Sequence, residues 1–128
     1  MKFDDEFEGK PLIDTLLEPT RIYVKEFKEC KNQINALAHI TGGGIVENLP
    51  RVLPDNLRAK VYKDKVKVLP IFELMGKYVE ESEMFRAFNM GVGMIFVVNQ
   101  SQVDEVLDKT DGYVIGEITS GEKGCDII

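Results

Sequence analysis

Three consecutive glycines, Gly42 to Gly44, are the feature of this sequence best suited to holding a ligand. An apolar run over residues 34–40 precedes them, and apolar side chains recur at helical spacing over residues 45–52, which predicts a strand, a tight turn and a helix. Glycine is favoured where the backbone needs positive φ or must approach another group closely. Backbone N–H groups at such a junction can converge on an anion. The pattern therefore predicts a phosphate site with Gly43, Gly44 and Ile45 as donors.

A second interpretation of the same turn is purely structural. Glycines also allow a helix to pack closely on a sheet, and composition alone favours the two interpretations equally. The Gly-x-Gly-x-x-Gly fingerprint and the Gly-x-x-x-x-Gly-Lys-Ser/Thr fingerprint are both absent, so the turn belongs to neither standard class of nucleotide site.

Polar side chains on both sides of the turn extend the candidate site. His39 ends the apolar run, where it can donate to a phosphate or move a proton near neutral pH, although a structural hydrogen bond is the plainer role. Arg51 has the forked donors that suit phosphate, with Asn48 beside it. An exposed helical pair between Glu47 and Arg51, contributing about 0.2–0.5 kcal/mol, is an equally good explanation of that arginine.

A second glycine-containing reversal follows an apolar helical segment. Asn89 precedes Gly91 there, and an asparagine at this position either adopts the left-handed conformation itself or presents its amide to a ligand. The methionines and phenylalanines around it, among them Met84, Phe85 and Phe88, fit a core better than a cofactor cage.

The elements that must position these residues alternate along the chain. A helical turn is expected over residues 12–17, and the segment 20–29 is either extended backbone entering a helix or a helix capped by Thr20, with Tyr23 and Phe27 favouring a helix. Strands are expected at residues 34–40, 57–63, 92–98 and 113–118, with the third buried on both faces. Helices are expected at residues 45–52, interrupted by Pro50, and at 71–78, 82–88 and 101–107, the last capped by Ser101.

This alternation predicts a mixed α/β (α+β) fold. We expect a roughly four-stranded mixed sheet covered by helices, with the strand order open. Residues 1–10 are charged and fit a terminal tail or linker remnant, which leaves residues 11–128 as one domain.

Composition excludes several classes of function. A net charge of −6 argues against nucleic acid or an anionic membrane as partner, because both are bound through lysine and arginine. Two distant cysteines and a single histidine exclude a zinc site and a disulfide framework, and no metal site is expected. No apolar segment approaches the ~20 residues of a membrane span, so a cytoplasmic protein with reduced thiols is expected.

Five blocks of the sequence, in this order, resemble the C-terminal part of the phosphoribosylformylglycinamidine cyclo-ligase (aminoimidazole ribonucleotide synthetase) family. They cover most of the chain between residues 16 and 118, and they are residues 19–24 (PTRIYV), 39–44 (HITGGG), 47–54 (ENLPRVLP), 83–94 (EMFRAFNMGVGM) and 113–118 (YVIGEI).

The resemblance implies a step of purine synthesis. In that reaction ATP phosphorylates the formyl oxygen of formylglycinamidine ribonucleotide, a nitrogen closes the imidazole ring, and ADP and phosphate leave. It implies a partly ferredoxin-like C-terminal domain whose glycine turn faces a cleft shared with an N-terminal domain. ATP and Mg²⁺ are then held mainly by that N-terminal domain, and the complete enzyme is a homodimer.

The resemblance also carries over roles for single residues. Gly42, Gly43 and Gly44 become the backbone that faces phosphate, and His39 and Thr41 line the cleft, with His39 as the candidate catalytic group. The remaining carried-over residues are possible substrate contacts, namely Asn48, Arg51 and Asn89.

The ATP-binding half of that family has no counterpart in these 128 residues. The first hypothesis is therefore a substrate-side domain that is inactive without its partner domain. A second is a stand-alone phosphate-binding or nucleotide-binding module. A third is a related enzyme of the same superfamily, which includes selenophosphate synthetase, thiamine-monophosphate kinase and the hydrogenase maturation ATPase, although residues 85–91 disfavour it.

Overall fold

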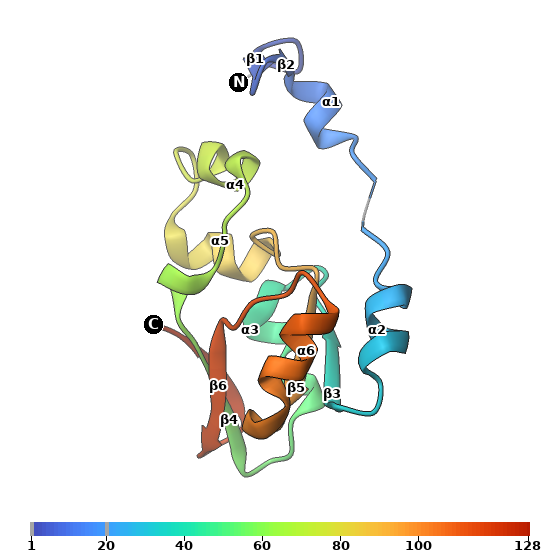
Figure 1. Cartoon of the computed structure of the whole chain (residues 1–128). Helices are drawn as coiled ribbons and strands as arrows, with labels where there is room; N and C mark the ends of the chain where they lie inside the picture. Colours follow the sequence, from blue (N-terminus) through green and yellow to red (C-terminus); the bar gives the residue numbers. More distant parts are fainter. Residues whose placement is uncertain (1, 20) are drawn as a thin grey trace.

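Short strands and short helices alternate along the chain in the computed structural model, which describes residues 2–19 and 21–128. Figure 1 shows the order of these elements, with β3 to β6 gathered in the lower part of the picture and β1, β2 and α1 at the top. The predicted mixed α/β class is confirmed. The four predicted strands all form, but they are divided between two hydrogen-bonded sheets.

The first sheet carries the glycine turn at its end. Strand β3 (Ile34–His39) pairs antiparallel with β5 (Met94–Val98), and His39 lies opposite Met94. Along β3, Ala38 is buried and His39 is exposed, as the two-residue period of a strand requires. The prediction that β5 is buried on both faces is wrong, because all five of its residues are only half-buried and its one partner among the described strands is β3.

The second sheet is built around β4 (Leu57–Val61). Strand β6 (Gly116–Ser120) pairs with it antiparallel, and β7 (Gly124–Ile127) pairs with it parallel on the other edge. The last predicted strand thus begins three residues later than expected, because Tyr113 is held outside the sheet, where its hydroxyl accepts a hydrogen bond from the backbone N–H of Lys67 at 3.0 Å. The sequence predicted no strand at β7.

An ion pair secures β7 against β4. The guanidinium of Arg58 donates from Nε to Asp126 Oδ2 at 2.7 Å and from Nη2 to Asp126 Oδ1 at 2.6 Å. Such a two-bond arrangement fixes orientation as well as distance. The hydrogen bonds from Arg58 lower the pKa of the Asp126 carboxyl and raise the pKa of Arg58 itself.

One group of helices packs beside the glycine turn. Helix α3 (Gly44–Asn48) is followed by the 3₁₀ turn η1 (Pro50–Val52), which confirms the predicted interruption at Pro50. Helix α5 (Glu81–Ala87) packs against α3, and α4 (Pro70–Met75) precedes α5 along the chain. The 3₁₀ turn η2 (Lys63–Lys65) connects β4 to this group.

A second pair of helices, α2 (Val24–Cys30) and α6 (Val103–Lys109), lies side by side (Figure 1). The predicted helix after residue 20 is present but begins only at Val24, so residues 21–23 enter it from outside, and Thr20 lies outside the described residues. The predicted Ser101 cap is wrong: Ser101 lies in the 3₁₀ turn η3 (Gln100–Gln102), and the N-cap of α6 is Gln102, without a side-chain hydrogen bond.

The first residues form a small arm. Strands β1 (Glu6–Phe7) and β2 (Lys10–Pro11) make a two-residue hairpin, which turns through positive φ at Glu8 and Gly9, and α1 (Leu12–Leu16) follows. Figure 1 shows this arm standing apart from the remaining elements. Leu12 is buried within the arm, but other apolar side chains of the arm are open, with Phe3 68% exposed and Leu17 72% exposed.

The hydrophobic core lies between the sheets and the helix group around α3. Its buried members are Ala38, Ile40, Ile45, Leu49, Leu53, Ala59, Val61, Val66, Met84, Phe85, Met90 and Val92. Met84 and Phe85, which the sequence assigned to the core, are confirmed there. No described helix is both long enough and apolar enough to cross a bilayer.

Candidate functional site

The glycine turn joins the end of β3 to the start of α3. On its β3 side, the N–H of Ile40 donates to the carbonyl of Gly93 at 2.9 Å, which anchors the turn to the entry of β5. Within the turn, the N–H of Gly44 donates to the carbonyl of Thr41 at 3.0 Å. Gly43 and Gly44 have φ values of 97° and 65°, which L side chains rarely adopt. The turn therefore needs glycine at these two positions for conformation alone.

The three glycines have three different surroundings. A Cβ on Gly44 would collide with the backbone carbonyls of Phe85 and Phe88 in and after α5, and a Cβ on Gly43 would collide with the side chain of Glu47. A Cβ on Gly42 would meet nothing within 4 Å. Gly44 is thus a packing residue, and the open approach to the turn is at Gly42.

The backbone donors divide in the same way. The N–H of Gly44, predicted as a phosphate donor, is already bonded to Thr41. Within the described residues, the N–H groups of Gly42 and Gly43 donate to no other group. Helix α3 has only five residues, so its dipole adds little to an anion site. The amides of Gly42 and Gly43 are therefore open to an anion, and the third predicted donor, the N–H of Ile45 in α3, stays a prediction.

Asn48 holds the turn in shape. Its side chain is buried, with 6% exposed, and Nδ2 donates to the carbonyls of Thr41, Gly42 and Gly44 at 3.2, 3.2 and 2.8 Å. The hydroxyl of Thr41 donates to Asn48 Oδ1 at 3.4 Å. A buried amide saturated by backbone in this way positions other groups, and the substrate contact expected of Asn48 stays a prediction.

Arg51 is tied to the same network from the solvent side. It is exposed, and Nη1 donates to Asn48 Oδ1 at 3.4 Å. The alternative pair between Glu47 and Arg51 does not occur, because α3 ends at Asn48 and η1 follows, which places Arg51 beside Asn48 three residues earlier. The remaining guanidinium donors of Arg51 make no hydrogen bond within the described part of the chain.

Asn89 adjoins the turn through the end of α5. Its Oδ1 accepts a hydrogen bond from the N–H of Gly91 at 2.9 Å, and Met90 and Gly91 take the left-handed conformations at φ values of 58° and 96°. The expectation that Asn89 itself adopts the left-handed conformation is wrong, because Met90 and Gly91 adopt it instead while the Asn89 side chain accepts from Gly91. Its role as a substrate contact stays a prediction.

His39 is the predicted site residue least connected to the others. It is exposed at the end of β3, on the face of the strand opposite Ala38 and Ile40, and its ring makes no hydrogen bond with any described residue. The structure therefore gathers Thr41, the glycines, Asn48 and Arg51 directly, brings Asn89 alongside, and leaves the His39 ring free in solvent.

Glu47 is part of the site in a way that sequence spacing did not indicate. Its carboxylate lies over Gly43, so the turn is flanked by one negative and one positive side chain, Glu47 and Arg51. An anion is repelled where it meets that carboxylate and attracted on the Arg51 side. Approach on the side away from the Glu47 carboxylate is therefore favoured. The sequence did contain a signal for this contact. Glu47 lies four residues after Gly43, and residues four apart lie on the same face of a helix.

Two comparisons with known proteins bear on this site. A family model described as "AIR synthase related protein, C-terminal domain" matches residues 1–126. A Streptococcus agalactiae serotype V protein named phosphoribosylformylglycinamidine cyclo-ligase is 50% identical over 119 residues, which are 88% of this chain and 35% of that protein. A Thermoanaerobacter protein of the same name is 46% identical over 124 residues, 91% of this chain and 37% of that protein. The chain spans about a third of the length of these relatives.

Proposed function

Because this chain belongs to the AIR synthase related protein family as its C-terminal domain, we propose that it forms the substrate side of a phosphoribosylformylglycinamidine cyclo-ligase. The proposed reaction closes the imidazole ring of formylglycinamidine ribonucleotide with consumption of ATP. The observation that carries the proposal is the 45–50% identity, over most of the chain, to proteins bearing that name. Cytoplasmic location and assembly of the complete enzyme as a homodimer belong to the same proposal.

The proposal assigns the phosphate of the nucleotide to the glycine turn. The open side of Gly42 admits a ligand, the N–H groups of Gly42 and Gly43 are free to donate within the described residues, and Arg51 supplies a positive charge beside them. Asn48 keeps these groups in position through three backbone carbonyls. This chain thereby binds and orients the nucleotide, and His39, exposed at the end of β3, is the proposed group that moves a proton.

ATP and Mg²⁺ are assigned to the remaining part of the proposed enzyme. Among residues 2–19 and 21–128, no three histidine, cysteine, aspartate or glutamate side chains are grouped as a metal ion requires. No step of the proposal on this chain passes through Mg²⁺.

Replacement of Gly42 by alanine tests the site without disturbing the fold. The added methyl enters open space and meets no protein atom within 4 Å, so it obstructs only a ligand that approaches the turn. We expect binding of formylglycinamidine ribonucleotide, measured by titration calorimetry, to weaken at least about tenfold, or ~1.4 kcal/mol. Gly76→Ala at the end of α4 is the control, since a Cβ there meets only the carbonyls of Phe72 and Glu73, at 3.4 Å, and lies outside the turn. Equal affinity of Gly42→Ala and the unaltered chain would refute the site.

Complementation tests the reaction itself. The 128-residue chain is assayed for ATP-dependent ring closure alone and after mixing with the N-terminal two thirds of the Streptococcus agalactiae relative. We expect turnover only in the mixture. Turnover by the chain alone would overturn the division of roles between the two parts, and absence of turnover in a mixture that forms a stable complex would overturn the proposed activity.

A further inference from the structure

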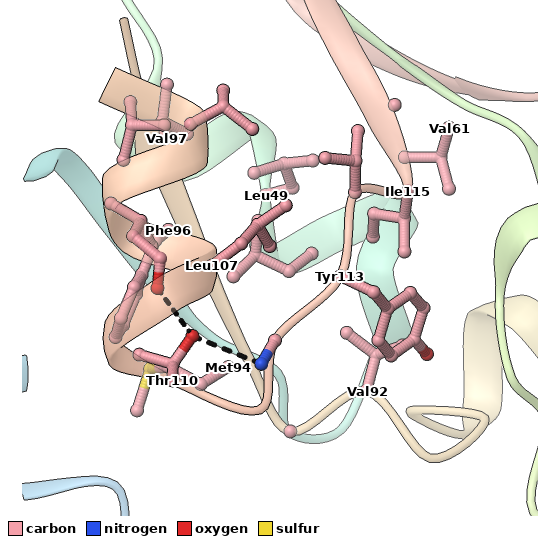
Figure 2. Close-up of a pocket in the computed structure, with 18 of the residues that line it drawn as sticks. Leu49, Val61, Val92, Met94, Phe96, Val97, Leu107, Thr110, Tyr113 and Ile115 are labelled. Carbon is pink, nitrogen blue, oxygen red and sulfur yellow. Dashed lines mark hydrogen bonds between the residues drawn. The ribbon is translucent and has the colours of Figure 1, made fainter. Parts of the chain in front are cut away.

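A cavity of about 280 Å³ is lined by parts of both sheets. Two unbroken runs of the chain border it, namely residues 91–98, which include β5, and residues 113–118, which lead into β6. Figure 2 shows Phe96 on one side of the cavity and Ile115 on the other. Among the described strands, β5 pairs only with β3 and β6 pairs only with β4. The cavity therefore adjoins two strands that each have one unpaired edge.

One hydrogen bond shows which backbone groups of β5 lie on its unpaired edge. The N–H of Ile40 donates to the carbonyl of Gly93 at 2.9 Å, one step beyond the pairing of His39 with Met94. In an antiparallel pair, successive residues direct their N–H and C=O groups alternately toward the partner strand and away from it. The backbone groups of Met94 and Phe96 thus point away from β3, and they have no other hydrogen-bond partner within the described residues.

The outer backbone groups of β6 are assigned in the same way. The N–H of Tyr62 donates to the carbonyl of Ile115 at 2.8 Å, so the next residue, Gly116, turns its backbone groups away from β4. Ile118 does the same two residues later. The residues with outward groups on both strands line the cavity. The cavity is thus bordered by two rows of backbone donors and acceptors, and such groups need partners wherever water does not reach them.

The sequence of β5 is that of an interior strand. Its residues, Met94–Val98, include no charged residue and no proline, which are the usual protections of an exposed strand edge. All five are only half-buried. Continuous apolar runs of this kind are typical of strands that are covered on both faces within a larger sheet. The unpaired edge of β5 is therefore a position suited to a further strand.

Apolar side chains define the chemistry of that further strand. Side chains of α6 and of the hydrophobic core line the cavity together with the two edges, among them Leu49, Val61, Val106 and Leu107. A charged side chain among them would lose its hydration, which is costly. Backbone N–H and C=O groups, in contrast, find partners along a strand edge. The cavity thus fits an extended, uncharged and apolar segment.

We propose that the cavity receives an extended apolar segment, which pairs with the outer edges of β5 and β6 and joins the two sheets into one. The segment is assigned to the part of the cyclo-ligase that this chain does not cover, because the chain spans about a third of the length of its relatives. This assignment rests on the proposed function. The substrate-side domain is then completed by a strand from the remaining part of the enzyme.

Amide hydrogen exchange, followed residue by residue by NMR, tests this pairing. The chain is measured alone and after mixing with the N-terminal two thirds of the Streptococcus agalactiae relative. We expect the outward amides of β5 and β6 to exchange at least about tenfold more slowly in the mixture. The amides of Ile95 and Val97 face β3 and are the internal control, since they are expected to be protected in both samples.

The outcomes separate this inference from the proposed function. Turnover in a mixture whose outward amides exchange as in the chain alone would overturn the inference and leave the function standing. Protection of those amides without turnover would support the inference and overturn the proposed activity. Absence of a complex would overturn the inference. Protection that appears in the chain alone as its concentration rises would give the cavity to a second copy and overturn the assignment.

Two variants of one residue isolate the backbone contribution. Met94 is the first residue of β5 and its N–H points away from β3, so Met94→Pro removes a donor that the chain itself does not use. We expect it to weaken the complex at least about tenfold. Met94→Ala, which loses the side chain but keeps the N–H, is the matched control. Equal affinity of the two variants, both shown by far-UV circular dichroism to be folded, would overturn the inference. The exchange pattern of the unaltered chain decides the question if the proline variant does not fold.

Discussion

Replacement of Gly44 by alanine tests whether the turn and α5 form one packed unit. Gly44 has a φ of 65°, and a Cβ there would meet the carbonyl of Phe88 at 2.8 Å and come closer still to that of Phe85. The left-handed conformation costs an L residue roughly 1–2 kcal/mol. Forcing a methyl between backbone atoms costs roughly 1–3 kcal/mol more. We expect the free energy of unfolding to fall by about 2–5 kcal/mol, a large share of the stability of a domain of this size.

Urea unfolding followed by far-UV circular dichroism measures this change, and Gly42→Ala is the internal control. The two glycines are separated by one residue, but Gly42 has neither a positive φ nor a neighbour near its Cβ. Alanine there leaves stability unchanged or raises it by about 0.4–1 kcal/mol through the unfolded state. Equal urea midpoints for Gly44→Ala and Gly42→Ala would refute the packed contact between the turn and α5.

Three further predictions concern other parts of the structure. Asn48→Ala leaves three backbone carbonyls without their donor and is expected to cost about 1–3 kcal/mol of stability in urea unfolding. An unchanged stability would contradict this and mean that water replaces the amide fully. Because Arg58 lowers the pKa of Asp126 in the folded state, the pair stabilises the chain above the ordinary aspartate pKa, and this contribution is lost as pH falls through the lowered pKa; Arg58→Leu should flatten that part of the acid unfolding curve. Burial raises the pKa of the Cys125 thiol to about 11 and also raises that of Cys30, so both should react slowly with a disulfide reagent at pH 8 until the chain is unfolded; fast labelling of the native chain would contradict this.

The local elements were predictable because periodicity reports them directly. Apolar alternation and helical spacing located β3, β4, α4 and α5 to within a few residues. Strand β7 was missed because it has only four residues and begins with Gly124, so it shows no clear alternation of apolar and polar residues. Its place in the sheet depends on the distant partner Arg58. Pairing across more than 60 residues leaves no trace in local sequence.

The candidate site was predictable as a location but less so as a set of roles. Three adjacent glycines marked the turn, yet only the folded structure distinguishes Gly44, with its positive φ and its packing against α5, from Gly42. Asn48 was chosen for its proximity to Arg51, whereas its amide faces the backbone of the turn itself. The cavity beside α6 had no signal at all, because apolar residues that leave a void look in sequence like apolar residues that fill a core.

The position of β7 has a consequence for how the chain acquires its structure. The central strand β4 comprises Leu57–Val61, and both of its partners, β6 and β7, lie between residues 116 and 127. Loops of some sixty residues must close before β4 is paired on either edge, which makes this step slow relative to the formation of local helices and turns. During synthesis, β4 leaves the ribosome well before its partners exist. Its unpaired edges are then exposed to other chains, and this interval is when chaperones matter most to this domain.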